Sequence, residues 1–284
     1  MAKSGVIRVA TCQFSVSGNI RRNGAQIRRQ IKQAKKGRAD VVHFSETALT
    51  GYAGNNFQTW DRFDWDALRS ETLAICQLAR KTKLWVILGS THRLTGKHLP
   101  HNSVYVISPQ GRIVDRYDKC FCTGSDLKYY SPGNHLPVFR INGVKCGVLI
   151  CYDLRFPELY RAYKKLGVQC IFQSFHNAGT DKGPNIWTRI MRQTMQARAA
   201  TNYLWISMNN SSAYYQSWPS TFIRPNGEIA ASLRFHRAGV MVNVVNTGLE
   251  LYDASGPYRE RAMKGILHSG QLVSDARSQD RKSL

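Results

Sequence analysis

Short apolar runs of strand length recur along the whole chain, and segments with a helical period lie between several of them. Strands that alternate with helices predict α/β layering. Turn signals between extended runs also predict hairpins. This mixed pattern suits two stacked sheets flanked by helices. The predicted strands are residues 6–14, 41–46, 85–91, 102–108, 144–151, 170–174, 203–209, 220–224 and 239–245. The predicted helices are residues 65–82, 157–166 and 187–200, and the hairpins turn at residues 109–111, 141–143 and 225–227.

The predicted strands are spread evenly, and no stretch rich in Pro, Gly and Ser separates them. We therefore expect a single domain over residues 1–284. Hydrophobic residues make up 43% of the chain, which is enough for a sizeable core, while the longest apolar runs are far too short to span a bilayer. From about residue 259 the chain is basic and polar, so it is expected to form a tail that could not bury itself alone.

Cysteine usage and the N-terminus both indicate the cytoplasm. Residues 1–5 lead directly into a strand-like run, without the hydrophobic segment of a signal peptide. Seven cysteines, an odd number, fit a reducing compartment better than a disulfide framework. Cys120 and Cys122 form a C-x-C pair, but no second pair with metal-ligand spacing follows, so a zinc site is not expected. The cysteines expected in the core are Cys12, Cys76, Cys146 and Cys170.

The net charge of +22 is compatible with binding to nucleic acid or to another anionic surface, but does not decide function. A basic cluster accompanies one predicted surface helix, in which Ile27, Ile31 and Ala34 mark the buried face. A solvated helix face is favoured over an anionic partner, since charge runs alone rarely specify binding and no nucleic-acid motif accompanies this one. The cluster comprises Arg21, Arg22, Arg28, Arg29, Lys32, Lys35, Lys36 and Arg38.

Three reactive side chains follow strand-like runs. Cys151 closes the apolar run at residues 147–150, Glu46 follows the run at residues 41–45, and Lys119 follows the extended stretch at residues 111–118. In open α/β sheets the carboxyl ends of strands face the ligand crevice. A thiol is only a few per cent ionised at neutral pH, so a cysteine nucleophile needs a neighbouring base. Convergence of these residues would supply that base and a cation.

These segments resemble the nitrilase superfamily of carbon–nitrogen hydrolases, in which Glu, Lys and Cys follow one another in this order. The stretch G-V-L-I-C-Y-D-L-R-F-P-E at residues 147–158 is similar to the amidase branch, and to omega-amidases more than to nitrilases. Four further motifs fall in the expected order, and the resemblance extends over nearly the whole chain. They are F-S-E-T with G-Y at residues 44–52, Y-D-K at 117–119, Y-S-P-G at 130–133 and Q-A-R-A at 196–199.

The resemblance implies an αββα sandwich that forms a homodimer or a higher homo-oligomer. It also implies that Glu46 acts as general base, that Lys119 stabilises the oxyanion, and that Cys151 forms a thioester with a small carboxamide. No metal or organic cofactor is expected. The residues expected to bind substrate or to form the oxyanion site are Tyr52, Tyr152 with its backbone N–H, His176 and Asn177.

The chain departs from the family pattern near the lysine. Many members carry a second glutamate six residues before the proline of the Pro-Gly motif, where it orients the lysine. Counting back from Pro132 gives Asp126, which retains the carboxylate on a side chain one methylene shorter. Asp126 is therefore the candidate supporting acid. The stretch K-C-F-C at residues 119–122 lacks the histidine that family members commonly carry two residues after the lysine, and Thr201 stands where a glutamate is usual in the later helix.

Two other functional classes stay open. A nitrile or N-carbamoyl hydrolase would use the same fold and the same nucleophile. A basic protein could instead retain the fold and bind a polyanion, nucleic acid included, without turnover. Without its surrounding motif, a cysteine after an apolar run is more often a small buried hydrophobic residue. Glu46 and Lys119, taken without their motifs, would be interpreted as ordinary surface charges. The ordered motifs favour the hydrolase.

Overall fold

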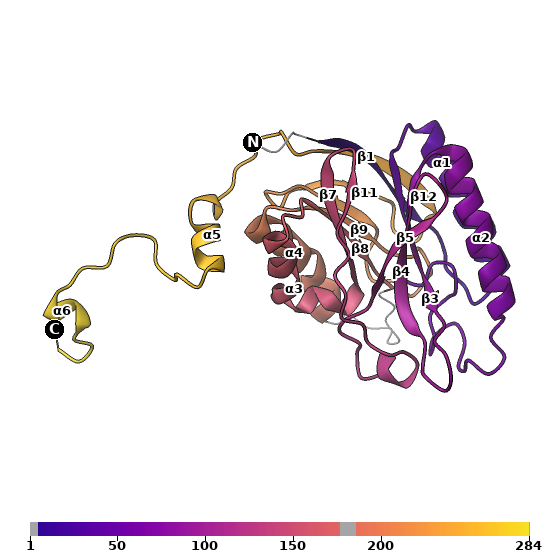
Figure 1. Ribbon diagram of the computed structural model, residues 1–284, viewed down its shortest axis with the longest axis horizontal. Helices are drawn as coiled ribbons and strands as arrows, with labels where there is room; N and C mark the ends of the chain where they lie inside the picture. Colours follow the sequence, from indigo (N-terminus) through magenta and orange to yellow (C-terminus); the bar gives the residue numbers. More distant parts are fainter. Residues whose placement is uncertain (1–4, 177–185, 284) are drawn as a thin grey trace.

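Two six-stranded sheets pack face to face, and helices cover the outer face of each (Figure 1). This is the expected four-layer αββα sandwich, in a computed structural model that describes residues 5–176 and 186–283. The first sheet has the order β12 (Gly239–Asn246), β1 (Val6–Gln13), β2 (Val41–His43), β3 (Trp85–His92), β4 (His101–Ile107) and β5 (Ile113–Asp118). The second has the order β11 (Ile229–Ser232), β10 (Thr221–Ile223), β9 (Trp205–Asn209), β8 (Cys170–Ser174), β7 (Val144–Ile150) and β6 (Phe139–Ile141).

Both sheets are mixed. Strands β1, β2 and β3 pair in parallel, as do β7, β8 and β9, and antiparallel strands flank each parallel set. Crossover segments join the parallel strands, and the helices that lie within them are α1 (Ile20–Lys36), α2 (Trp65–Thr82), α3 (Pro157–Lys165) and α4 (Ile186–Asn202). The parallel strands therefore end at the same edge of the sandwich, where reactive side chains can meet.

Local sequence explains helices α1 and α2. The Asn19 side chain accepts a hydrogen bond from the N–H of Arg22 (2.9 Å), and Asp64 caps α2 by accepting from the N–H of Ala67 (2.8 Å). Ile27 and Ile31 of α1 are fully buried against the first sheet. The predicted amphipathic helix around the basic cluster is therefore confirmed.

Apolar side chains fill the space between the sheets. Residues such as Val9 and Val104 of the first sheet join Val148 and Ile171 of the second in one cluster, and all four are fully buried. Each such side chain contributes about 1.5–3 kcal/mol by leaving water. This layer fixes how the two sheets face each other.

A buried polar chain also crosses between the sheets. His43, the last residue of β2, contacts the Ser207 hydroxyl through Nδ1 (2.8 Å) and the Ser174 hydroxyl through Nε2 (3.0 Å). Ser207 also contacts Thr11 of β1 (2.8 Å), and Ser174 donates to the carbonyl of Phe44 (3.1 Å). Burial lowers the pKa of His43 to about 3, so its imidazole is neutral. The chain ties β2 to β8 and β9.

Most sequence-predicted elements are confirmed, with shifts at several ends. Strand β8 and helix α2 have the predicted bounds, and the three predicted hairpins join β4 to β5, β6 to β7 and β10 to β11. The strand predicted at residues 41–46 ends at His43, because the backbone leaves the sheet and Thr47 takes a positive φ of 48°. Tyr203, predicted to begin a strand, instead follows α4 with a φ of 52°.

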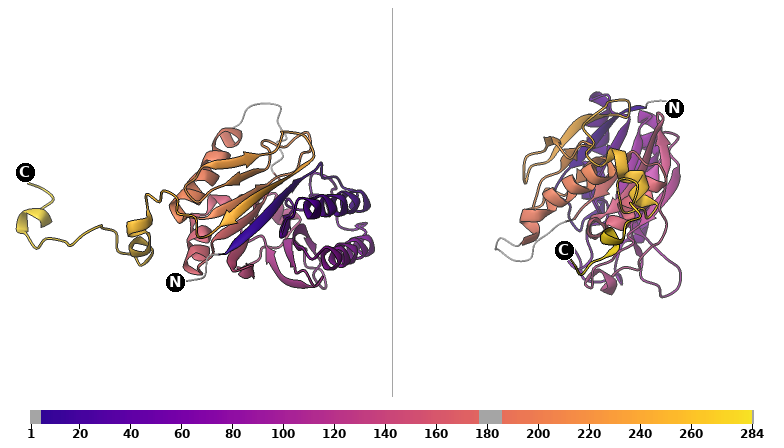
Figure 2. Two further views of the ribbon diagram at one scale, coloured as in Figure 1. Left: turned by 90° about the horizontal axis from the view of Figure 1, so that it is seen from above. Right: turned by 90° about the vertical axis from the view of Figure 1, so that its left-hand side faces the viewer.

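The C-terminal segment extends away from the sandwich (Figures 1 and 2). It carries two short helices, α5 (Gly256–Met263) and α6 (Ala276–Gln279), and Leu267 and Leu272 in it are exposed. The single domain over residues 1–284 stays a prediction. In the part of the chain that the structure describes, no helix combines the length and apolarity that crossing a bilayer requires.

Candidate active site

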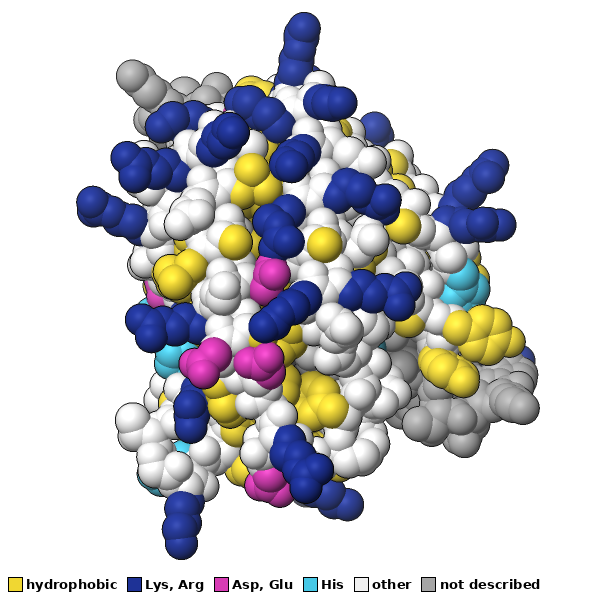
Figure 3. Space-filling view, turned by 90° about the vertical axis from the view of Figure 1, so that its right-hand side faces the viewer, with side chains coloured by type: hydrophobic (Ala, Val, Ile, Leu, Met, Phe, Trp, Pro, Cys, Tyr) yellow, Lys and Arg dark blue, Asp and Glu magenta, His cyan; other side chains and the backbone are white. Residues whose placement is uncertain are grey.

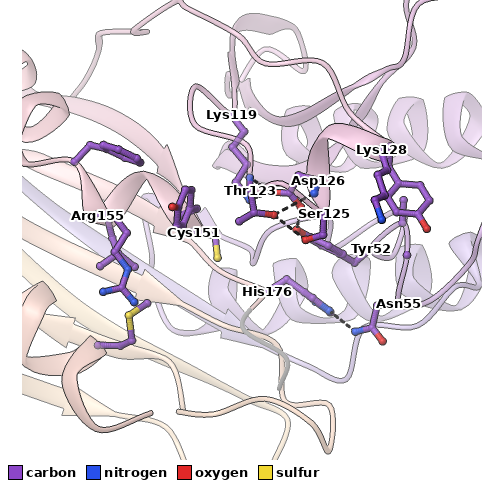
Figure 4. Close-up of a pocket in the computed structure, with 17 residues that line it drawn as sticks. Tyr52, Asn55, Lys119, Thr123, Ser125, Asp126, Lys128, Cys151, Arg155 and His176 are labelled. Carbon is purple, nitrogen blue, oxygen red and sulfur yellow. Dashed lines mark hydrogen bonds and ion pairs between the residues drawn. The ribbon is translucent and has the colours of Figure 1, made fainter. Parts of the chain in front are cut away.

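A cavity of about 700 Å³ opens where the carboxyl ends of β5, β7 and β8 meet. Lys119, Asp126 and Cys151 all line it, and so do His176 and Tyr52, whose hydroxyl points to Asp126 (Figure 4). Residues far apart in sequence thus come together, as the strand-end argument predicted. Glu46 is fully buried and contacts Lys119 below the cavity surface.

Cys151 lies in a sharp turn between β7 and the 3-10 helix η2 (Cys151–Arg155). Its φ is 40°, a left-handed conformation that is uncommon for a residue with a side chain and is often found at functional sites. Asp153 holds the turn, because its carboxylate accepts from the N–H groups of Ile150 and Phe121, both at 2.9 Å. The Tyr117 hydroxyl donates to the same carboxylate (2.7 Å). Asp153 therefore ties the turn to the strand that leads to Lys119.

The Q-A-R-A motif supports the same turn from helix α4. Arg198 Nε donates to the carbonyl of Leu154 (3.1 Å), at the end of η2. Its guanidinium also lies over the Tyr160 ring, 5.7 Å from the ring centre. Arg198 is thus a structural support of the Cys151 turn, with Thr201 one helical turn away on the exposed surface.

Glu46 is held by donors on both carboxylate oxygens. Oε1 accepts from Asn102 Nδ2 (2.7 Å) and from Lys119 Nζ (3.0 Å), and Oε2 accepts from the backbone N–H of His176 (2.7 Å). A carboxylate has about four lone-pair sites. Among the described residues three donors are used, so one site on Oε2 is left for a further proton donor. The same His176 N–H also lowers the pKa of the Cys151 thiol.

Lys119 is fixed by its backbone and by two carboxylates. Its N–H donates to the carbonyl of Asn102 (2.9 Å), and its carbonyl accepts from the N–H of Gly133 (2.9 Å). Gly133 must be glycine, because a Cβ there would lie 2.4 Å from the Cβ of Asp118. This close approach accounts for the Pro-Gly motif. The Lys119 side chain is fully buried between Glu46 and Asp126.

Asp126 occupies the position that the sequence assigned to a supporting acid. It begins the 3-10 helix η1 (Asp126–Lys128), and its Oδ2 lies 2.8 Å from Lys119 Nζ. Oδ2 also accepts from the N–H of Thr123 (2.9 Å), while the Tyr52 hydroxyl donates to Oδ1. Asp126 is therefore oriented on both oxygens, and it contacts Lys119 despite its shorter side chain.

Burial and charge set the protonation of this cluster. Burial raises the pKa of Glu46, and nearby Lys119 only partly offsets this effect. For Lys119, burial alone would lower the pKa, but Glu46 and the other anionic groups around it raise the pKa well above its ordinary value. Asp126 is also buried, yet Lys119 and the hydrogen bonds hold its pKa below the usual range. The lysine is therefore an ammonium at neutral pH.

The thiol of Cys151 does not ionise readily by itself. Burial raises its pKa, and Glu46 adds to the increase, while Lys119 and the His176 N–H oppose it. A nucleophilic role therefore requires that the thiol lose its proton during the attack. A neighbouring carboxylate with a raised pKa, such as that of Glu46, can accept this proton.

The predicted pocket residues separate into three groups. Tyr52 and His176 stack with ring centres 4.7 Å apart, and His176 Nε2 contacts Asn55 Nδ2 (3.0 Å). Burial lowers the pKa of His176 to about 4, so it is neutral. The side chain of Tyr152 lines the cavity and is partly exposed. Asn177 lies outside the described residues.

The remaining cysteines differ from Cys151 in position. Cys12, Cys76, Cys146 and Cys170 are buried, as expected. Cys120 and Cys122 are partly buried, and burial raises their pKa values to about 11 and about 12. Among the described residues, Cys151 is the cysteine that lines the cavity. No group of three or more potential metal-binding side chains occurs in the described ranges.

Sequence reasoning missed Asn102 and Asp153 as supports of the site. Asp153 was inside the quoted C-Y-D-L-R-F-P-E motif, so its spacing from Cys151 was an available signal. Asn102 offered a weaker signal, because it is one of three polar residues that begin a strand whose second half is mainly apolar. Its partner Glu46 lies 56 residues earlier, and only the folded chain relates the two.

The carbon-nitrogen hydrolase family model matches residues 8–249, which is most of the 284-residue chain. The chain belongs to this family. It is 30% identical over 204 residues to a "hydrolase in agr operon" of Staphylococcus lugdunensis, covering 68% of this chain and 82% of the relative. It is 27% identical over 260 residues to omega-amidase NIT2 of Xenopus tropicalis, covering 86% and 88%.

Solved structures of the same fold include an amidase of Nesterenkonia sp. AN1. One of its mutants shows covalent addition of the acetamide moiety of fluoroacetamide at the active-site cysteine. The two chains are 20% identical, with a TM-score of 0.76 and coverage of 92% of this chain and 97% of the amidase. The expected nitrilase-superfamily membership and the assignment as an amidase-type carbon–nitrogen hydrolase are thus confirmed.

Proposed function

We propose that the protein hydrolyses a small carboxamide to a carboxylate and ammonia through a thioester on Cys151. One observation carries this proposal: Lys119 and Asp126, ion-paired in a buried cluster with Glu46, line the same cavity as a cysteine held in a left-handed turn. A thiol, a base and a fixed cation are the groups that acyl transfer needs.

In the first step the Cys151 sulfur attacks the amide carbon while its proton passes to Glu46 Oε2. This oxygen has the open lone-pair site, and the His176 N–H that donates to it also favours the ionised form of the thiol. Negative charge develops on the amide oxygen, where the Lys119 ammonium and the backbone N–H of Tyr152 stabilise it. Because Asp126 and Glu46 hold Lys119 from two sides, the ammonium is oriented before substrate arrives.

Collapse of this intermediate breaks the carbon–nitrogen bond. Glu46 returns its proton to the leaving nitrogen, ammonia departs, and the acyl group stays on the Cys151 sulfur. A water molecule then attacks the thioester, Glu46 accepts one of its protons, and the thiolate leaves and is reprotonated. The products are a carboxylic acid and the free thiol, so the enzyme returns to its initial state without a redox step.

The cavity limits the substrate class. Its volume of about 700 Å³ admits a small molecule, and its walls combine the stacked Tyr52 and His176 rings with Lys128 and Arg155. These cations support amides that carry a carboxylate as the first compounds to test. The names of relatives, such as omega-amidase, support the same choice.

Ammonia release from a panel of small amides, nitriles and N-carbamoyl compounds tests the proposal. We expect turnover of amides, an acyl adduct on Cys151 in rapidly quenched samples, and no turnover by Cys151→Ala. Preferred turnover of a nitrile or an N-carbamoyl compound would assign the other hydrolase class. An inactive but polyanion-binding protein, or an adduct on Cys120 or Cys122, would contradict the proposed mechanism. The cytoplasmic location and the homodimer or higher homo-oligomer stay predictions.

A further inference from the structure

Basic doublets repeat along helix α1 at a spacing of seven residues. They are Arg21-Arg22, Arg28-Arg29 and Lys35-Lys36, and Lys32 lies between the second and third. Seven residues complete almost two turns, so the doublets line up on one side of the helix at intervals of about 10 Å. The helix contains no acidic residue. Its outer side is therefore a continuous row of positive charge.

Few of these cations form ion pairs within the described structure. Arg28 forms an ion pair with Glu71 of α2, and Arg21 lies 3.7 Å from the exposed Asp64. In the described structure the side chains of Arg29, Lys32 and Lys36 are exposed and make no ion pair or hydrogen bond, and Arg22 and Lys35 are in the same state. Five cations on one helix face are left to the solvent.

This arrangement is unfavourable for the free helix. Arg29 and Lys32 are three residues apart, and Lys32 and Lys36 are four apart, so like charges stand next to each other. Such pairs destabilise a helix, and burial of Ile27 and Ile31 must offset their effect. An anionic ligand would remove the repulsion, because it would neutralise several of these cations together.

The charged row belongs to a larger basic face. Figure 3 views the side of the molecule on which α1 and α2 lie, where Lys and Arg side chains are spread over the face and clearly outnumber the acidic ones, which lie mainly in its lower part. Helix α2 contributes exposed Arg69, Arg80 and Lys81, and Lys83 follows it. The α1/α2 face, defined by these residues and the exposed cations of α1, lies away from the cavity that contains Cys151.

We propose that the α1/α2 face binds nucleic acid through its phosphate backbone, independently of base sequence. The charges are complementary, arginine and lysine are the usual phosphate donors, and the row on α1 is long enough to follow several phosphates. This site is separate from the proposed hydrolytic site.

Two other occupants fit the face less well. A membrane-bound helix inserts apolar side chains between lipids, but the apolar side chains of α1 are buried in the core. A second copy of this chain would place the same positive row against itself in a two-fold contact. Nucleic acid needs neither apolar anchors nor a complementary acidic protein surface.

Fluorescence anisotropy with a labelled RNA duplex of about 20 base pairs tests the proposal on the full-length protein. The test variant is Arg29→Gln/Lys32→Gln/Lys36→Gln, which keeps good helix formers on exposed positions. We expect binding by the parent that weakens steeply with salt, and a loss of about tenfold or more in affinity for the variant. The slope of log K against log salt should decrease by about 2 to 3.

A charge-matched control separates this face from general electrostatic attraction. Lys165→Gln/Lys264→Gln/Arg277→Gln removes the same charge from exposed positions at the end of α3, after α5 and in α6. These elements lie to the left in Figure 1, whereas α1 and α2 lie at the right. The control should retain parental affinity. Equal loss in both triple variants, no loss in the α1 variant, or tighter binding to phosphatidylserine vesicles than to RNA would overturn the proposal.

A footprint on the unmodified protein gives a second readout. With RNA bound, Lys32, Lys35 and Lys36 should become less reactive toward an amine-acetylating reagent, whereas Lys165 and Lys264 should not. Uniform protection, or none on α1, would contradict the assignment even if the variants misfold. Ammonia release should be the same for the parent and the α1 variant, so failure of this proposal leaves the hydrolytic proposal unaffected.

Discussion

Asp126 Oδ2 and Lys119 Nζ lie 2.8 Å apart, although aspartate is one methylene shorter than the glutamate usual at this position. Asp126 begins the 3-10 helix η1, and its side chain is buried beside the lysine. The N–H of Thr123 and the Tyr52 hydroxyl then fix both carboxylate oxygens.

Asp126→Asn should lower kcat by about 10- to 100-fold, because a hydrogen bond to a charged group contributes about 1.5–3 kcal/mol. KM should change less, as expected for a group that supports the transition state. Steady-state kinetics with the best amide would check this. Asp126→Glu tests whether the loop accepts the longer acid. Parental kcat in Asp126→Asn would show that Glu46 alone orients Lys119.

Cys151→Ser should retain less than about a thousandth of the parental kcat. An alcohol is much harder to deprotonate than a thiol, and the carboxylate of Glu46 is a weak base even with its raised pKa. Ammonia release under saturating substrate measures the effect. Cys122→Ser is the matched control and should stay active. A Cys151→Ser variant with substantial turnover would exclude thioester formation as the route.

Gly89→Ala should destabilise the protein by about 1–3 kcal/mol and reduce its activity, because overpacking of a well-packed core is costly. A Cβ at Gly89 would lie 1.8 Å from the carbonyl oxygen of Ser45, which directly precedes Glu46. Backbone cannot move aside as a flexible side chain can. Urea unfolding measures the stability. At Gly124 an added Cβ meets nothing within 4 Å, so Gly124→Ala should unfold at the parental urea concentration.

His43 should make stability depend on pH. Its pKa is about 3 in the folded protein because of burial and near 6.5 in an unfolded chain. As the pH falls below about 6.5, the unfolded state binds the proton first. The stabilising contribution is therefore complete above about 6.5 and is lost toward pH 3, by up to about 1.4 kcal/mol per pH unit.

Urea unfolding at pH 7.5, 6 and 5 would measure this dependence. His43→Gln should be less stable than the parent at pH 7.5, since the Ser174 and Ser207 hydroxyls lose a partner. Its unfolding free energy should also fall less steeply on acidification. The exposed His98 provides the control, and His98→Gln should reproduce the parental pH profile. Identical slopes for His43→Gln and the parent would refute the assignment.

The sequence predicted the layers well because helix and strand periodicities are local. The buried stripe of α2 and the apolar run of β8 each lie within one element, so their bounds followed directly. The end of β2 was less predictable. Phe44 continues the apolar run, but the chain turns at Ser45 to pack against Gly89 of another strand.

The sequence indicated which residues make up the candidate site, but not which contacts hold them in place. Glu46, Lys119 and Cys151 each follow a strand, and the strand-end rule brought them together. The contacts of His43 join residues more than 130 positions apart, and a histidine in a strand gives no sign of its partners. Long-range polar pairs of this kind depend on how the sheets face each other, which periodicity does not specify.

The polar chain through His43 crosses between the layers that supply the site. Glu46 and Lys119 follow strands of the first sheet, whereas Cys151 follows a strand of the second. Neither half of the sandwich holds both Cys151 and Glu46, the nucleophile and the base of the proposed mechanism. During unfolding, any state in which the sheets have separated must be catalytically silent, even with its helices intact. The recovery of enzymatic activity during refolding would then report when the two sheets pack together. Turnover should return at the rate of that packing step, not at the rate of helix formation.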